Sequence, residues 1–198
     1  MALAELKGHT IEDIYALPDG QRAELIDGEM YMMAPPSRRH QHISMSLSHT
    51  IKDYIISQNG TCDVYAAPFA VFLSKDDKTY VEPDISVICD KDKLTEEGCS
   101  GAPDWIIEIV SPGSRQMDYM KKLFKYRSAN VREYWIVDIE KNRITVYDFQ
   151  NAVTEEYNLN EIVPVSIFKD LSIDFKEIMK SSPSAKATSR LVIPAEAE

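Results

Sequence analysis

The chain has 198 residues, with 44% hydrophobic and 27% charged side chains and a formal net charge of −10. These proportions are typical of a soluble globular domain. No apolar run approaches the ~20 residues that cross a bilayer, which excludes a membrane-spanning helix. The first eight residues also lack the basic start and the long apolar stretch of a signal peptide. We therefore expect a cytoplasmic protein without membrane contact.

The domain organisation is predicted to be simple. Residues 1–180 are expected to form one domain, whereas residues 181–198 are dominated by Ser, Pro, Ala and Thr and predict a flexible tail. The chain has only three cysteines and no C-x-x-C pair. This odd count argues against a disulfide framework and against a cysteine-rich zinc site.

Capping and turn signals predict the elements of the first sixty residues. Thr10 with Asp13 three residues later is close to a capping box, and Asp27-Gly28 is a strong hairpin signal. Apolar residues at helical spacing follow Pro35-Pro36. The predicted elements are a helix over residues 10–17, strands at 22–26 and 29–33, and a long helix over 37–57.

Further along, apolar runs alternate with polar turns. The predicted elements are strands at 62–66, 69–73, 81–89 and 105–110, a helix over 117–129, a hairpin at 133–139 and 143–149, an edge strand at 153–157 and a last helical turn at 175–179. The helix over 117–129 is expected to pack through Met120, Leu123, Phe124 and Arg127. Strands interleaved with two substantial helices predict an α/β fold, with a mixed central sheet flanked by helices.

A carboxylate inside an apolar strand is the strongest functional signal. Glu108 lies within the apolar run at 105–110, where an ionised side chain must be paired, bound to a metal or neutralised. Twenty-four residues earlier, Asp84 follows Pro83 and opens another apolar run. If the two runs are neighbouring strands, ~4.8 Å apart, both carboxylates can reach one cation. The pattern predicts the metal site of a nuclease.

The Pro103-Asp104 pair repeats the Pro-Asp pattern, but we assign it no role in the site. Asp104 precedes Glu108 by four residues on the same strand, which separates them by ~13 Å. Oxygen ligands lie ~2.1 Å from Mg²⁺, so these two carboxylates cannot share an ion unless the strand bends.

A lysine two residues after Glu108 would complete the PD-(D/E)XK motif of a large nuclease superfamily, but Val110 stands there. Some branches move the lysine to the following helix, which here offers Lys121, Lys122 and Lys125. The chain resembles one such branch, the Uma-two family of restriction endonucleases, from about Thr10 to Phe149. The matching segments, in order, are residues 24–29, Ala34-Pro35, His40-x-x-Ile43, Pro83-Asp84, residues 102–112, Lys122-x-x-x-Tyr126 and residues 131–138. Asn130 stands where the family usually has a glycine, at a helix end.

The resemblance implies a restriction-endonuclease-like fold and a metal-dependent endonuclease that hydrolyses phosphodiester bonds, in DNA rather than RNA. Glu24, Asp84 and Glu108 would be the acidic ligands of Mg²⁺ or Mn²⁺, and Lys122 would be the displaced catalytic lysine. His40 matches the family's histidine and would contact a phosphate or cap its helix.

Two weaker expectations accompany this assignment. Asp118 and Tyr126 lie four residues from Lys122 on either side, so Asp118 could hold the lysine in place. Because many nucleases of this class cut with two subunits, exposed hairpin edges are compatible with a homodimer.

Other functions fit the same residues. A catalytically weak or silent nuclease fold could act as a binding or assembly module, since the net charge of −10 is unusual for a DNA-binding protein. A hydrolase of small phosphate substrates is the other alternative, although the chain has no glycine-rich phosphate loop. Zinc at His40, His42 and His49 is disfavoured because no metal-ligand spacing accompanies them.

Overall fold

The computed structural model of the chain describes residues 8–180, so the predicted tail at 181–198 lies outside the described residues. The elements are α1 (Ile11–Tyr15), β1 (Ala23–Ile26), β2 (Glu29–Met32), α2 (Arg38–Ser57), β3 (Asp63–Ala66), β4 (Val71–Phe72), β5 (Ile85–Ile88), η1 (Lys91–Lys93), β6 (Cys99–Ser100), β7 (Trp105–Val110), η2 (Met117–Lys122), α3 (Leu123–Ser128), β8 (Glu133–Asp138), β9 (Arg143–Asp148), β10 (Val153–Tyr157), β11 (Ile162–Pro164), β12 (Ser172–Asp174) and α4 (Phe175–Ile178). None of the helices in this part of the chain is long and apolar enough to cross a bilayer.

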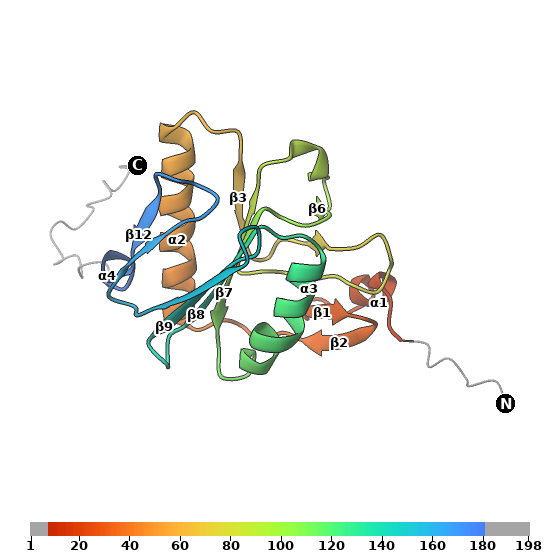
Figure 1. The fold of residues 1–198 in the computed structure, drawn as a ribbon. Coiled ribbons are helices and arrows are strands. Elements are labelled where there is room, and N and C mark those ends of the chain that lie inside the picture. Colours follow the sequence, from red (N-terminus) through yellow and green to blue (C-terminus); the bar gives the residue numbers. More distant parts are fainter. Residues whose placement is uncertain (1–7, 181–198) are drawn as a thin grey trace, which may run out of the picture.

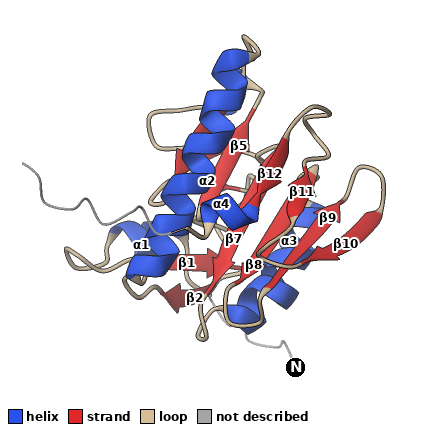
Figure 2. Cartoon of the chain, turned by 90° about the vertical axis from the view of Figure 1, so that its left-hand side faces the viewer, coloured by secondary structure: helices blue, strands red, loops and turns tan. Residues whose placement is uncertain are grey.

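A six-stranded mixed sheet forms the centre of the molecule, in the order β10-β9-β8-β7-β5-β3. Strands β7 and β8 are parallel, and the other neighbouring pairs are antiparallel. Helix α2, together with α4, covers one face, and the helical segment formed by η2 and α3 covers the other (Figure 1, Figure 2). The predicted α/β fold, a mixed sheet flanked by helices, is confirmed.

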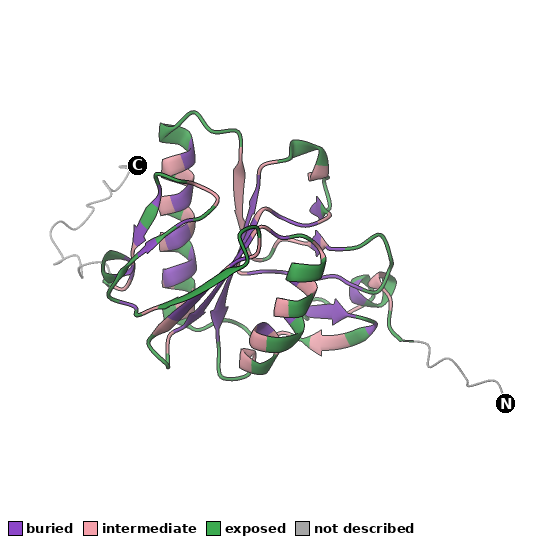
Figure 3. Cartoon of the chain, in the orientation of Figure 1, coloured by how far each residue is buried: buried purple, intermediate pink, exposed green. Residues whose placement is uncertain are grey.

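Successive side chains of the central strands point to opposite faces of the sheet, which divides the core into two layers. On β7, Trp105, Ile107 and Ile109 pack in the layer of α2, whereas Ile106 and Val110 pack in the layer of η2 and α3. The central strands are buried on both faces, which explains their nearly continuous apolar sequences (Figure 3).

The β1–β2 hairpin lies beside η2 and α3, outside the main sheet (Figure 1). Its turn residues Asp27 and Gly28 have φ angles of 53° and 77°, which fits the tight hairpin turn predicted from this dipeptide. Leu25 exchanges backbone hydrogen bonds with Tyr80, so the hairpin is fixed to the chain that enters β5.

The predicted packing side of the helix over 117–129 is wrong for Met120, Phe124 and Arg127, whereas Leu123 packs against the core as predicted. Met120 and Phe124 are 62% and 68% exposed, whereas Asp118, Lys122 and Tyr126 are buried. The helix turns its polar stripe inward because it packs over a carboxylate of the sheet, as described below.

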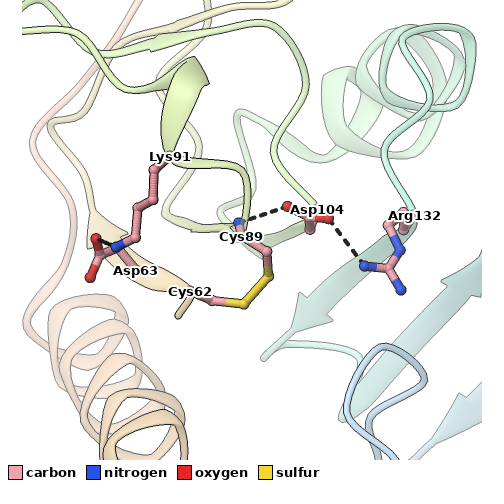
Figure 4. The surroundings of a disulfide bond; sticks show 6 residues. All are labelled: Cys62, Asp63, Cys89, Lys91, Asp104 and Arg132. Atoms are coloured by element: carbon pink, nitrogen blue, oxygen red, sulfur yellow. Dashed lines mark hydrogen bonds and ion pairs between the residues drawn. A yellow bond between two sulfur atoms is a disulfide. The ribbon is translucent and has the colours of Figure 1, made fainter. Parts of the chain in front are cut away.

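The odd cysteine count argued against disulfides, and this prediction is wrong for two of the three cysteines. Cys62 and Cys89 form a disulfide between the ends of β3 and β5 (Figure 4). The β3–β5 register pairs Asp63 with Ile88, so the next residues along each strand, the two cysteines, lie opposite each other. The third cysteine, Cys99, is buried and free.

Candidate active site

Glu108 lies in the middle of β7 with its side chain buried under η2 and α3. It shares the sheet face of Ile106 and Val110, because side chains alternate along a strand. Its Oε1 atom accepts hydrogen bonds from Lys122 Nζ at 2.9 Å and from the Tyr126 hydroxyl at 2.7 Å. The acid inside the apolar run is therefore paired, as the cost of burying a charge requires.

Glu24 reaches the same lysine from the β1–β2 hairpin. Strand β1 is buried along its whole length, and only 6% of the Glu24 side chain is exposed. Glu24 Oε2 lies 2.8 Å from Lys122 Nζ, and Oε1 accepts a hydrogen bond from the backbone N–H of Glu82 at 2.9 Å. Both oxygens thus have partners within the protein.

Asp84 lies directly before β5, at the same place in the sheet as Glu108. The antiparallel register of β5 and β7, continued by one residue, places the two carboxylates opposite each other. Asp84 Oδ2 accepts a hydrogen bond from the backbone N–H of Ile109 at 2.7 Å and lies 3.0 Å from His40 Nε2. His40 belongs to the first turn of α2, whose start therefore lies beside Asp84.

The lysine itself is carried by a π-helical segment, a form that often marks functional sites. Asp118, Lys122 and Tyr126 lie at intervals of four residues, on the side that faces the sheet. Asp118 Oδ1 lies 3.7 Å from Lys122 Nζ, and this buried atom has no hydrogen-bond partner among the described residues.

Burial and the charges of neighbouring groups have opposing effects on the pKa of each of these residues. Burial raises the pKa of Glu108 well above its usual range and that of Asp118 to about 6, and in both cases the Lys122 ammonium opposes the shift. Burial disfavours a charged Lys122, but Glu108, Glu24 and Asp118 outweigh it and raise the lysine pKa. The ammonium therefore stays charged and compensates the surrounding acids.

His40 is subject to the same two opposing influences. Burial disfavours its charged form, but the hydrogen bond to the Asp84 carboxylate and the charge of that group outweigh burial and raise the histidine pKa. His40 Nδ1 is buried and has no hydrogen-bond partner within residues 8–180. The Asp84–His40 pair thus resembles the Glu108–Lys122 pair, with a basic side chain beside each acid.

Asp104, the aspartate of the second Pro-Asp pair, lies elsewhere and is occupied. Its Oδ2 accepts a hydrogen bond from the backbone N–H of Cys89 at 2.8 Å, and its Oδ1 lies 3.1 Å from an amino group of Arg132 (Figure 4). Lys121 and Lys125, the other two lysines considered for the site, are paired instead with Glu29 and Asp27 of the hairpin.

The predicted site residues come together from separate elements. One group joins Glu24, Glu108 and Lys122, and the other joins Asp84 and His40 at the neighbouring strand. Sequence reasoning gave no role to Tyr126, which contacts Glu108, although its spacing from Lys122 was visible.

An oxygen-ligated divalent ion fits the chemistry of these residues, although the acids are not grouped around a ready-made cavity for it. Among the described residues, no group of three or more His, Cys, Asp or Glu side chains is arranged to hold a metal. Asp84 Oδ1 and Glu108 Oε2, however, accept no hydrogen bond from these residues and belong to opposed carboxylates. Mg²⁺ is commonly held by one or two carboxylates, with water and substrate phosphate as further ligands.

Comparison with known proteins agrees with the resemblance seen in the sequence. The model of the Uma2 family, described as "Putative restriction endonuclease", matches residues 11–176. Two Synechocystis proteins, slr1290 and sll1609, are each 24% identical to this chain. The first match covers 64% of this chain and 66% of the relative, and the second covers 75% and 86%.

A solved structure shares the fold. The crystal structure of "a putative nuclease belonging to DUF820" from Anabaena variabilis is similar with a TM-score of 0.70 and 23% sequence identity. The match covers 86% of this chain and 97% of that one. The likeness supports the same arrangement of sheet and helices in both proteins.

Proposed function

The chain belongs to the Uma2 family, and we propose that it is a metal-dependent endonuclease that hydrolyses phosphodiester bonds, in DNA rather than RNA. The observation that carries the proposal is the convergence of Asp84, Glu108 and Lys122, from the start of β5, from β7 and from η2, at one place in a buried sheet. Two opposed acids can hold a divalent ion, and a lysine beside them can stabilise the charge that develops on a phosphate during hydrolysis.

Asp84 and Glu108 would hold Mg²⁺ or Mn²⁺, which supplies Lewis-acid stabilisation of the phosphate and lowers the pKa of a water molecule. Lys122 is held in the site by Glu24, and it donates a hydrogen bond to Glu108 Oε1. An ammonium so placed can stabilise charge that develops on a phosphate or orient the attacking water. Tyr126 fixes the orientation of Glu108, and His40 that of Asp84. Glu24 as a third metal ligand stays a prediction.

The test combines metal binding with cleavage. Mn²⁺ is titrated calorimetrically into wild type, Asp84→Asn and Glu108→Gln, and cleavage of plasmid DNA, single-stranded DNA and RNA is followed with Mg²⁺, Mn²⁺ or EDTA. We expect metal-dependent DNA cleavage, a loss of Mn²⁺ binding in both variants, and a rate reduced about 10²–10³-fold in Lys122→Met.

Asp104→Asn is the matched control, because it changes the other Pro-Asp pair and leaves the site intact. It should bind Mn²⁺ and cleave like wild type. Equal losses in Asp104→Asn and Asp84→Asn would show that the assay reports folding, and cleavage in EDTA would contradict the metal-dependent reaction.

A non-catalytic binding or assembly module is the second candidate. It is favoured by one observation: the Lys122 ammonium already forms ion pairs with both Glu24 and Glu108, so these buried acids have a cationic partner without a metal. If wild type binds no Mn²⁺, with or without DNA, this second function replaces the first.

A further inference from the structure

The ammonium of Lys122 makes fewer hydrogen bonds than it can. A lysine ammonium has three N–H donors. Two are directed at Glu24 Oε2 and Glu108 Oε1, at 2.8 Å and 2.9 Å. The third carboxylate, Asp118 Oδ1, lies 3.7 Å away, which is beyond hydrogen-bond distance.

One oxygen of the Asp118 carboxylate is in a complementary position, as an acceptor without a donor. The residue is 2% exposed, and its Oδ1 atom is buried and has no hydrogen-bond partner among residues 8–180. Leaving a buried acceptor atom without a hydrogen bond is costly even when a cation lies 3.7 Å away, so this atom calls for an explanation. The backbone of Asp118 cannot supply the missing partner, because its N–H is bonded to the Ser114 carbonyl and its C=O to the Tyr134 hydroxyl.

A divalent ion on Glu108 would change the balance around Lys122. The ion and the ammonium are both cations, so their presence on the same carboxylate is unfavourable. Lysine is a flexible side chain with a point charge, and can move its ammonium while it keeps one partner. A shift of less than ~1 Å from 3.7 Å would bring Asp118 within hydrogen-bond distance, and Glu24 could remain the fixed contact.

We propose that Asp118 is a positioning residue that receives the ammonium of Lys122 when a divalent ion takes Glu108. Lys122 is then the resident cation of the metal-free site, and metal binding is an exchange of one cation for another. By accepting a hydrogen bond from the displaced ammonium, Asp118 holds Lys122 in the site, beside the position of the phosphate. This inference rests on the proposed metal site and adds how that site is regulated.

The experiment is a double-mutant cycle in Mn²⁺ affinity, measured by calorimetry on wild type, Asp118→Asn, Lys122→Met and the double variant. With Lys122 present, Asp118→Asn should weaken Mn²⁺ binding about tenfold, as is typical for partners of metal ligands. With Met at position 122 there is no ammonium to receive, so the same substitution should change the affinity less than about twofold. Asp27→Asn, which removes one negative charge from the exposed hairpin turn, should leave the affinity unchanged.

Two outcomes would overturn the inference. No loss in Asp118→Asn would show that the lysine needs no second acceptor, and an equal loss in both backgrounds would show that Asp118 acts on the ion itself. A failure of the proposed function would give a different result, because wild type itself would then bind no Mn²⁺.

If Lys122→Met does not fold, a crystal structure of wild type with Mn²⁺ decides the question. We expect Lys122 Nζ within ~3 Å of Asp118 Oδ1 and no longer on Glu108. A metal bound at Asp84 and Glu108, with Lys122 still on Glu108, would contradict the exchange.

Discussion

His40 Nε2 lies 3.0 Å from Asp84 Oδ2, so the first turn of α2 is joined to the strand that carries the candidate metal ligand. The same oxygen accepts the backbone N–H of Ile109. With two donors on Oδ2, the carboxylate of Asp84 is held in one orientation and its Oδ1 is left for another partner. Such fixing of a ligand by neighbouring groups is what metal sites usually require.

We expect His40→Leu to weaken Mn²⁺ binding about 10–100-fold, because Asp84 loses the partner that orients it. Calorimetric titration measures the change. The control is His42→Leu on the same helix, since His42 contacts the carbonyl of Lys180 and not the site. If the two variants bind Mn²⁺ equally well, His40 has no part in orienting Asp84.

Asp118→Asn should flatten the pH dependence of stability between about pH 4 and pH 6. The pKa of Asp118 is about 6 in the folded protein, whereas that of an unfolded aspartate is ~3.9. In this range the folded state keeps a proton that the unfolded state has lost, so the free energy of unfolding of wild type falls as pH rises.

Urea unfolding in EDTA at several pH values measures this effect. Between pH 4 and pH 6, the free energy of unfolding of the variant should rise by about 2 kcal/mol relative to that of wild type. This difference should level off above the folded-state pKa of Asp118. A slope remains in both proteins because the pKa of Glu108 is raised as well. Parallel stability profiles for the two proteins would contradict the raised pKa of Asp118.

Arg38 and Arg39 are predicted to bind DNA phosphates. They open α2 directly before His40, both are exposed, and the first turn holds no acidic residue. Cations at a helix N-terminus oppose the helix dipole at a cost of about 0.3–1 kcal/mol each. Two arginines in this unfavourable place, beside the site, suggest a function that offsets the cost.

The double variant Arg38→Ala/Arg39→Ala should therefore be slightly more stable than wild type and bind DNA more weakly. DNA binding is measured in Ca²⁺ at several salt concentrations. The slope of the logarithm of the DNA-binding constant against the logarithm of the salt concentration should fall in magnitude by about two, one for each lost phosphate contact, while the Mn²⁺ affinity stays the same. Lys52→Ala, ~20 Å further along the same helix, is the control. Unchanged DNA affinity in the double variant would place the DNA elsewhere.

The sequence predicted those elements whose pattern is long and continuous. The bounds of β7 agree with the apolar run at 105–110, because a strand buried on both faces has no polar interruptions except Glu108. Strands β11 and β12 were missed, since three residues are too few to show alternation. The predicted strand at 81–89 pairs in the sheet only at Ile85–Ile88, because its first residues bond to other segments.

Within the site, the sequence predicted the residues better than their contacts. Burial cost identified Glu108, but the rule that apolar residues face inward failed on the next helix, where Met120 and Phe124 are exposed. The helix instead buries Asp118 and Lys122, since the face of the sheet beneath it carries an acid. A local pattern cannot show this, because the partner of Lys122 lies on another strand.

The Cys62–Cys89 disulfide is expected to stabilise the fold without controlling the site. Its cysteines are separated by 27 residues, and a loop of this length contributes about 3–4 kcal/mol in the chain-entropy model. Reduction with dithiothreitol should therefore lower the Tm, and the variant Cys62→Ala/Cys89→Ala should not respond to the reductant. Mn²⁺ affinity should stay unchanged on reduction, because β5 is also held by the Asp104 bond to Cys89 N–H and by the contact of Asp84 with Ile109. A weaker affinity in the reduced protein would instead couple the disulfide to the metal site through β5.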